Sequence, residues 1–223
     1  MFDLDGTLLD RDTSIEQFST LQYDRLNTYL GQISKIDYIS RFIALDCHGH
    51  VWKDKVYQDL VAEFKIEGIS WQSLLDDYET KFQFHCVPFP ALLEMLATLK
   101  QQGYLLGIIT NGRGEFQTKA ISGLGIDDYF DVIIISEIEG VRKPELEIFQ
   151  LALDRLGVLA QNSIFVGDNP TADISGAKNA GMRAIWKRNS DWLESTDADA
   201  AIDELSEIPA LLARFNNAIG SNL

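Results

Sequence analysis

The strongest constraint on this chain is a series of apolar runs that alternate with helical segments after residue 88. The runs lie at 104–109, 131–136, 163–167, 183–186 and, more briefly, near 199–202. A helical pattern at 90–102 precedes the first run, and others follow at 114–123, 145–156, 171–180 and from about 208 onward. Strands without a polar face must be covered on both faces, so the alternation predicts a parallel sheet between two layers of helices. Ligands of such sheets bind at the carboxyl ends of the strands.

The segment from residue 13 to residue 88 has only helical periodicity. Apolar side chains recur at helical spacing in four successive groups, around Phe18, Phe42, Leu60 and Leu75. Four helices with short connections are typical of a small bundle. We therefore predict an α/β protein with a Rossmann-like parallel-sheet core at 1–12 and 89–223, and an inserted four-helix-bundle cap at 13–88.

Charge and composition exclude several classes of protein. The formal net charge of −15 repels nucleic-acid backbones and anionic membrane surfaces, so we expect neither as a partner. The sequence has no apolar run long enough to cross a membrane and no secretory leader pattern. Two cysteines provide no disulfide framework, and the three histidines have no zinc-site spacing. We expect a cytoplasmic protein that is a monomer or a weak homodimer.

Polar residues follow the predicted strands at the points where a ligand would bind. Residues 1–5 have the pattern of a strand end, which carries Asp3 and Asp5. Thr110 ends the strand at 104–109, Lys143 lies in the loop after 131–136, and Asp168 ends the strand at 163–167. Crowded carboxylates raise one another's pKa or require a cation. Hard oxygen ligands with open positions suit Mg²⁺ that shares a substrate phosphate. This edge of the sheet is therefore predicted to bind magnesium and a phosphate group.

Four motifs in this order resemble those of the haloacid dehalogenase superfamily. They are Met-Phe-Asp-Leu-Asp-Gly-Thr at 1–7, Thr-Asn-Gly at 110–112, Lys-Pro at 143–144 and Gly-Asp-Asn-Pro-Thr-Ala-Asp at 167–173. Each motif alone has an ordinary structural explanation as a turn or a helix cap, but the set spans nearly the whole chain. The resemblance implies a phosphatase of the subfamily with a helical cap of the first type.

The resemblance also implies roles for individual residues. Asp3 is expected to attack phosphorus and form an aspartyl-phosphate, and Asp5 to act as general acid and then general base. Thr110 and Lys143 are expected to bind the phosphoryl group, helped by backbone N–H groups near Asn111 and Gly112.

The expected Mg²⁺ ligands are the Asp3 and Asp168 carboxylates and the main-chain carbonyl of Asp5. Asp173 is expected to lie behind these ligands rather than to touch the metal. The expected substrate is a small phosphorylated metabolite.

Three other functions remain open at this point. A sugar-phosphate mutase of the β-phosphoglucomutase type would share all four motifs, and a haloacid dehalogenase would share most of them, although Asp5 argues against it. A non-catalytic scaffold with a relic site is the third. The polar segment at 45–55 contains His48, His50, Trp52 and Lys53. These side chains either contact the substrate and select it, or belong to an ordinary interhelical loop with a core tryptophan.

The chain departs from the family pattern in two places. A leucine, Leu146, stands where a second proline often follows Lys143-Pro144, which we expect to affect structure only. Only Met1 and Phe2 precede Asp3, whereas the strand that bears the nucleophile should be central and about five residues long. We therefore expect a native form with a few more apolar residues upstream.

Overall fold

The computed structural model describes residues 1–192 and 197–220, with side chains described as far as residue 215. The chain divides into two compact units. One comprises Met1–Asp10 and Pro88–Leu223, and the other comprises Arg11–Val87.

The first unit contains a parallel sheet. Its strands are β1 (Gly107–Thr110), β2 (Val132–Ile135), β3 (Ile164–Gly167), β4 (Arg183–Lys187) and β5 (Ala200–Ile202). β1 pairs with β2, while β3, β4 and β5 pair in that order, and all of these pairings are parallel. The predicted parallel-sheet α/β fold is confirmed.

The N-terminal segment joins the two halves of this sheet. Phe2 forms parallel bridges to Ile108 of β1 on one side and to Val166 of β3 on the other. The Asp3 N–H donates to the Val166 carbonyl at 2.9 Å. The predicted central position of the segment that bears Asp3 is therefore confirmed, and its backbone is hydrogen-bonded on both sides.

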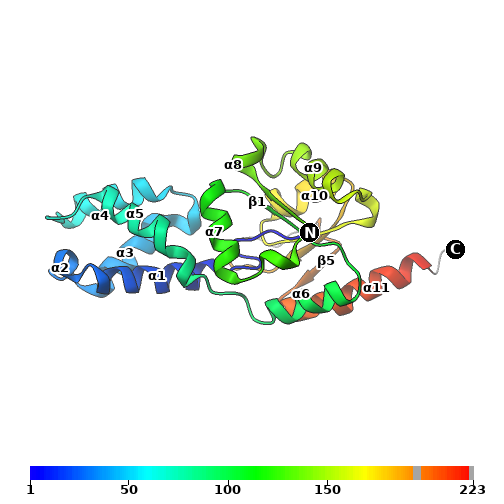
Figure 1. Cartoon of the computed structure of the whole chain (residues 1–223), viewed down its shortest axis with the longest axis horizontal. Helices are drawn as coiled ribbons and strands as arrows, with labels where there is room; N and C mark the ends of the chain where they lie inside the picture. The colour runs from blue at the N-terminus through cyan, green and yellow to red at the C-terminus, as the bar shows by residue number, and fades with distance from the viewer. Residues whose placement is uncertain (193–196, 221–223) are drawn as a thin grey trace. The chain divides into compact units, whose positions relative to one another are not determined.

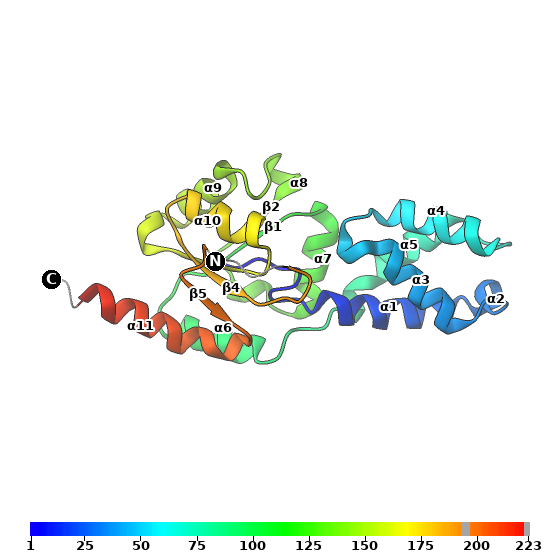
Figure 2. The ribbon, with the colours of Figure 1, turned by 180° about the vertical axis from the view of Figure 1, so that it is seen from behind.

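Helices cover both faces of the sheet. They are α6 (Leu92–Gln101), α7 (Gly114–Leu124), α8 (Ser136–Glu139), α9 (Leu146–Leu156), α10 (Gly176–Asn179) and α11 (Ile208–Gly220). Figures 1 and 2 show α9 and α10 on one side of the strands and α6 beside α11 on the other. Phe149 and Phe165 lie in the core between β2, β3, β4 and α9. Their rings pack edge to face, with centroids 5.3 Å apart.

The second unit is helical. Its elements are α1 (Arg11–Arg25), α2 (Asn27–Leu30), α3 (Lys35–Asp46), α4 (Lys53–Phe64) and α5 (Trp71–Lys81), with short 3₁₀ turns at Cys47–Gly49 and Phe82–His85. Aromatic side chains from α1, α3, α4 and α5 fill its interior. Gln22 lies among them, and its Oε1 accepts hydrogen bonds from the hydroxyls of Tyr38 and Tyr57 at 3.1 and 2.9 Å. One buried polar side chain is thus shared by three helices.

Several element boundaries differ from the sequence prediction. β1 begins at Gly107 instead of 104, because the chain before it is held by a hydrogen bond from the Leu106 N–H to Asp131 Oδ2. The predicted helix at 171–180 is a π-helical turn, Pro170–Ser175, followed by α10. The four-residue helix α8 was not predicted, because one turn is too short to show a periodicity.

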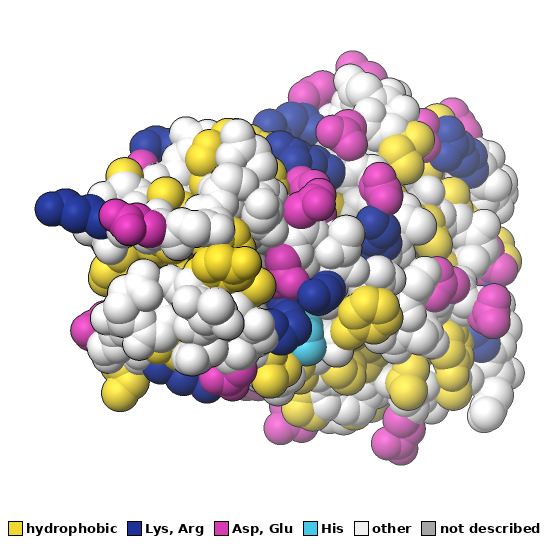
Figure 3. Space-filling model, turned by 60° about the vertical axis from the view of Figure 1, so that its left-hand side comes forward, with side chains coloured by type: hydrophobic (Ala, Val, Ile, Leu, Met, Phe, Trp, Pro, Cys, Tyr) yellow, Lys and Arg dark blue, Asp and Glu magenta, His cyan; other side chains and the backbone are white. Residues whose placement is uncertain are grey.

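The surface carries charges of both signs. In the face shown in Figure 3, lysine and arginine side chains lie among aspartates and glutamates. Among the ion pairs of the protein are Arg41 with Glu63 and Arg155 with Glu139. Within the part of the chain that the structure describes, no helix has the length and hydropathy required to cross a membrane.

We predict that Phe149→Ala lowers the free energy of unfolding by about 3–5 kcal/mol, because it removes a fully buried ring and leaves a cavity against Phe165. Leu159→Ala is the matched control, since its side chain is 63% exposed and the change should stay within about 0.5 kcal/mol. Urea unfolding of both variants measures the difference. Equal losses would contradict the placement of Phe149 at the centre of the core.

Candidate active site

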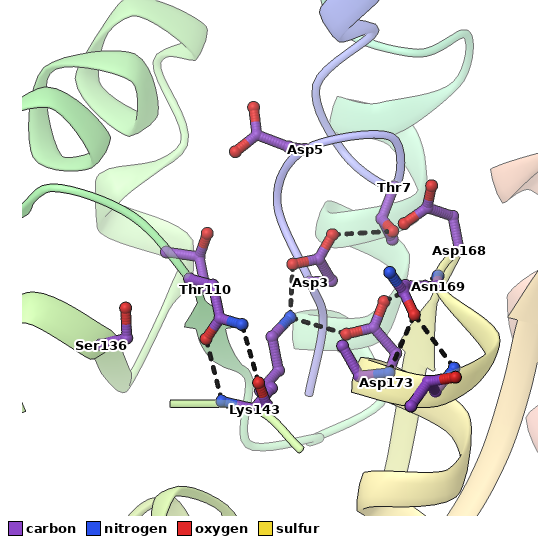
Figure 4. Close-up of polar contacts among 12 residues, drawn as sticks. Asp3, Asp5, Thr7, Thr110, Ser136, Lys143, Asp168, Asn169 and Asp173 are labelled. Atoms are coloured by element: carbon purple, nitrogen blue, oxygen red, sulfur yellow. Dashed lines mark hydrogen bonds and ion pairs between the residues drawn. The ribbon is translucent and has the colours of Figure 1, made fainter. Parts of the chain in front are cut away.

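An ion-pair network at the carboxyl ends of the strands links three segments that are far apart in the sequence. Lys143 Nζ donates to Asp3 Oδ1 at 2.5 Å and to Asp173 Oδ1 at 2.7 Å. All three side chains are buried. Figure 4 shows Lys143 between the two carboxylates, with Thr7 donating to the other oxygen of Asp3 at 3.2 Å. The lysine and the nucleophile candidate predicted from sequence are therefore in direct contact.

Asp168 lies beside this network at the end of β3. Its Oδ2 accepts hydrogen bonds from Asn189 Nδ2 at 2.8 Å and from Trp192 Nε1 at 3.2 Å. Trp186 Nε1 donates to the Asp168 main-chain carbonyl at 2.7 Å. The segment that follows β4 thus fixes the orientation of Asp168. Among the described residues, its Oδ1 has no hydrogen-bond partner.

Two glycines allow these carboxylates to approach the backbone. A Cβ on Gly6 would lie 2.5 Å from Asp168 Oδ2, and Gly6 also has a positive φ of 81°. A Cβ on Gly167 would lie 2.4 Å from the Cβ of Asp173. Any side chain at either position would therefore push an aspartate out of the site.

The buried charges do not balance. Burial, together with the charges of Asp173 and Asp168, raises the pKa of Asp3 well above its ordinary value, although Lys143 opposes this. Burial and the neighbouring Asp173 raise the pKa of Asp168 to about 6. Burial alone would lower the pKa of Lys143, but the charges of Asp173 and Asp3 raise it instead. Three buried carboxylates facing one ammonium require a further cation if all are to be ionised.

The donor atoms fit a hard divalent cation. Carboxylate oxygens of Asp3, Asp168 and Asp173 all lie within 4.8 Å of one another. Both oxygens of Asp173 are already engaged, one by Lys143 and the other by the Asn169 N–H at 3.0 Å. Asp173 is also the most buried of the three, at 1% exposure against 6% for Asp3 and 7% for Asp168, so Asp3 and Asp168 are better placed to hold a cation. An all-oxygen set with few protein ligands is typical of Mg²⁺.

Asp5 and Thr110 belong to a second network, formed by a side chain that the motifs did not include. Gln117 Nε2 lies 2.7 Å from Asp5 Oδ2 and 2.8 Å from Thr110 Oγ1. In Figure 4 the Asp5 side chain lies apart from the group formed by Asp3, Lys143 and Asp173. The site therefore consists of one network centred on the Lys143 ammonium and one centred on the neutral Gln117 amide.

Asn111 and Gly112 have partners within the protein. The Asn111 side chain exchanges hydrogen bonds with the backbone N–H and C=O of Lys143, both at 2.9 Å, and so fixes the lysine backbone. The Gly112 N–H donates to Ser136 Oγ at 3.0 Å. This N–H therefore has a partner within the protein, and its expected role in substrate binding stays a prediction.

The sequence motifs missed several side chains that shape the site. Gln117, Ser136 and Trp192 all lie outside the four motifs, and nothing in their residue types marks them as functional. Gln117 carries a weak signal, since it is a polar residue at a buried position of α7, shortly after the second motif.

Comparison with known proteins identifies the family. The sequence pattern of haloacid dehalogenase-like hydrolases matches residues 1–187. The chain is 41% identical over 147 residues to a glyceraldehyde 3-phosphate phosphatase of Pyrococcus abyssi, covering 65% of this chain and 61% of the relative. It is 29% identical to the pyrophosphatase PpaX of Bacillus cereus over 98% of this chain and 97% of the relative.

A solved structure agrees with these matches. The HAD phosphatase from Thermococcus onnurineus superposes with a TM-score of 0.66 at 30% identity, covering 95% of each chain. The chain spans about 60% of the length of the glyceraldehyde 3-phosphate phosphatases of Pyrococcus furiosus and Pyrococcus abyssi. The chain belongs to the haloacid dehalogenase-like hydrolases.

The charge excess predicts how stability depends on pH without metal. Asp168 has a folded-state pKa of about 6 against an ordinary value of 3.8, so the folded state binds its proton more tightly than the unfolded state. The contribution of Asp168 to the free energy of unfolding therefore falls as the pH rises from about 4 to about 6, and it stays low at higher pH. Asp168→Asn removes the charge, so we expect metal-free protein to gain about 1–3 kcal/mol at neutral pH and almost nothing near pH 4.

Urea unfolding in the presence of a chelator, across this pH range, measures the effect. Asp128→Asn is the matched control, because Asp128 is exposed and its replacement should change stability by less than about 0.5 kcal/mol at every pH. A gain that is independent of pH would contradict the assignment to the buried charge.

Proposed function

We propose that this haloacid dehalogenase-like hydrolase is a Mg²⁺-dependent phosphatase that cleaves small phosphate monoesters through a phosphorylated Asp3. The observation that carries the proposal is the buried contact of Lys143 with Asp3 and Asp173 beside Asp168. A carboxylate that attacks an anionic phosphate must overcome like-charge repulsion, and this arrangement supplies the positive charge that opposes it.

In the first half of the proposed reaction, an Asp3 carboxylate oxygen attacks phosphorus and the bond from phosphorus to the ester oxygen breaks. Asp5 gives its proton to the departing oxygen, so the product alcohol leaves neutral. Lys143 and the Thr110 hydroxyl hold the phosphoryl oxygens while their charge is redistributed. Asp3 is held in position by Lys143 and by Thr7, which limits misalignment with phosphorus.

In the second half, the Asp5 carboxylate removes a proton from a water molecule. The water oxygen attacks phosphorus, the bond between Asp3 and phosphorus breaks, and inorganic phosphate leaves. Asp3 returns as a carboxylate and Asp5 regains its proton, so both residues are ready for another cycle.

The proposed metal ligands are the carboxylates of Asp3 and Asp168, with the Asp5 main-chain carbonyl. When bound, Mg²⁺ would supply Lewis-acid neutralisation of the phosphate charge. Asp173 keeps Lys143 in place from behind these ligands, and Asn189 and Trp192 keep Asp168 oriented.

The substrate is proposed to be a small phosphorylated metabolite, consistent with relatives named for glyceraldehyde 3-phosphate, phosphoserine and pyrophosphate. The mutase alternative predicts a rearranged sugar phosphate instead of free phosphate, and the dehalogenase alternative predicts halide release without metal. We propose that the protein acts in the cytoplasm, as a monomer or weak homodimer, and binds neither nucleic acid nor membranes.

We predict that Asp3→Asn lowers kcat on p-nitrophenyl phosphate by at least about 1,000-fold, because the amide cannot attack phosphorus. The exposed control Asp128→Asn should keep wild-type activity. Circular dichroism of both variants checks that the fold is retained, and mass spectrometry of the quenched wild-type enzyme tests for phosphate on Asp3. Turnover by Asp3→Asn near the wild-type rate would rule out the assigned nucleophile.

We also predict that chelation removes activity and that added Mg²⁺ restores it. Asp168→Asn should raise the Mg²⁺ concentration needed for half-maximal activity by at least about tenfold, since it replaces a charged ligand with a neutral one. The measurement is a Mg²⁺ titration of phosphate release by both proteins. Full activity after exhaustive chelation would exclude the metal-dependent mechanism.

A further inference from the structure

Gln117 occupies an unusual position for a buried amide. Its side chain extends from the first turns of α7 and is 2% exposed. The nitrogen Nε2 lies within hydrogen-bond distance of Asp5 Oδ2, Thr110 Oγ1 and, at 3.3 Å, the Asn111 carbonyl. Among the described residues, its Oε1 is the one buried side-chain oxygen or nitrogen without a hydrogen-bond partner.

The chemistry of the neighbours fixes which way the amide faces. The Asn111 main-chain carbonyl only accepts hydrogen bonds, so the Gln117 atom that lies 3.3 Å from it must be the nitrogen. The same nitrogen lies 2.7 Å from Asp5 Oδ2. This orientation leaves Oε1 unpaired, at a cost of about 1–3 kcal/mol. An amide whose nitrogen is hydrogen-bonded while its buried oxygen has no partner indicates a functional constraint rather than optimised packing.

The same contact constrains the Thr110 hydroxyl. A threonine hydroxyl has one hydrogen to donate and two lone pairs that accept. Gln117 Nε2 donates to one lone pair, and within the described part of the chain Thr110 Oγ1 donates to no other group. The hydroxyl hydrogen therefore stays available for another acceptor, such as a phosphoryl oxygen.

The second motif leaves room for this amide. A Cβ on Gly112 would lie 2.8 Å from both Cγ and Nε2 of Gln117, and 2.9 Å from Cδ. Gly112 does not have a positive φ, so its backbone conformation does not require glycine. The space occupied by Gln117 therefore gives a physical reason for the glycine in Thr110-Asn111-Gly112.

The start of α7 is itself fixed. The Gly114 N–H donates to Glu137 Oε2 of α8 at 2.7 Å, and the Gln117 N–H donates to the Arg113 carbonyl at 2.9 Å. These bonds hold the helix, and with it the amide, relative to β1 and Thr110.

We propose that Gln117 is a positioning residue of the phosphatase reaction, whose amide holds the Asp5 carboxylate beside Thr110 and leaves the Thr110 hydroxyl free to donate to the phosphoryl group. This inference rests on the proposed function, because it assigns Gln117 to the proton transfer carried out by Asp5.

Dependence on the leaving group separates this role from a merely structural one. Phenyl phosphate needs a proton on its departing oxygen, whereas 2,4-dinitrophenyl phosphate releases a stable anion and needs little help. We expect Gln117→Leu to lower kcat/KM at least about tenfold more for phenyl phosphate than for 2,4-dinitrophenyl phosphate. Asp5→Asn should likewise lower kcat/KM more for phenyl phosphate than for 2,4-dinitrophenyl phosphate. On phenyl phosphate, kcat/KM of the double variant Asp5→Asn, Gln117→Leu should be no more than about threefold below that of Asp5→Asn alone.

Two further variants keep the test decisive. Thr118→Ala is the matched control, because this exposed neighbour on α7 bonds only to the Gly114 carbonyl of its own helix and should leave both rates unchanged. If Gln117→Leu does not fold, Gly112→Ala tests the same contact by displacing the amide. Gly112→Ala should also lower kcat/KM more for phenyl phosphate than for 2,4-dinitrophenyl phosphate. Added to Gln117→Ala, it should lower kcat/KM no further.

The outcomes are distinguishable. If Mg²⁺-loaded wild-type protein cleaves neither aryl phosphate, the proposed function fails and this inference fails with it. If the wild type is active but Gln117→Leu changes neither rate, or lowers both equally, the phosphatase assignment stands and the role of Gln117 is overturned. Independent, multiplicative losses in the double variant would also overturn it.

Discussion

The structure depends on a buried excess of negative charge at one edge of a parallel sheet. Asp3, Asp168 and Asp173 are all nearly inaccessible to water, and Lys143 is the ammonium that contacts two of them. Removing carboxylates from water is costly unless they are paired or bind a metal. In the proposed function, the same excess would give the site affinity for a divalent cation and for the phosphate that accompanies one.

The residues around these buried charges hold them in position. Gly6 and Gly167 let two of the carboxylates lie against the backbone, and Trp186 and Trp192 orient Asp168 of the fourth motif through indole N–H groups. Asn111 fixes the backbone of Lys143. Several of the polar and glycine residues of the motifs are therefore explained by positioning other side chains.

The sequence predicted the parts of the site that strand ends determine. Parallel strands bring their carboxyl ends to one edge, so topology predicted that Asp3, Thr110 and Asp168 lie there, with Lys143 in a neighbouring loop. The direct contact between Lys143 and Asp3 was expected from the family resemblance. Contacts that depend on the path of a side chain were not predictable. Gln117 reaches Asp5 across 112 residues of sequence, and Ser136 binds the Gly112 N–H from a one-turn helix too short for periodicity to reveal.

The two carboxylates of the first motif face different donors, and this difference matches their proposed roles. Asp3 contacts a charged ammonium, whereas Asp5 contacts a neutral amide. A hydrogen bond from a charged donor is roughly twice as strong as one from a neutral donor, so the Lys143 ammonium opposes the rise in the pKa of Asp3 that burial causes. A nucleophile must stay ionised until it attacks, but a group that delivers and recovers a proton must exist in both forms during each cycle. A second lysine in place of Gln117 would favour the ionised form of Asp5 over its protonated form. An amide orients Asp5 without adding a charge to the site.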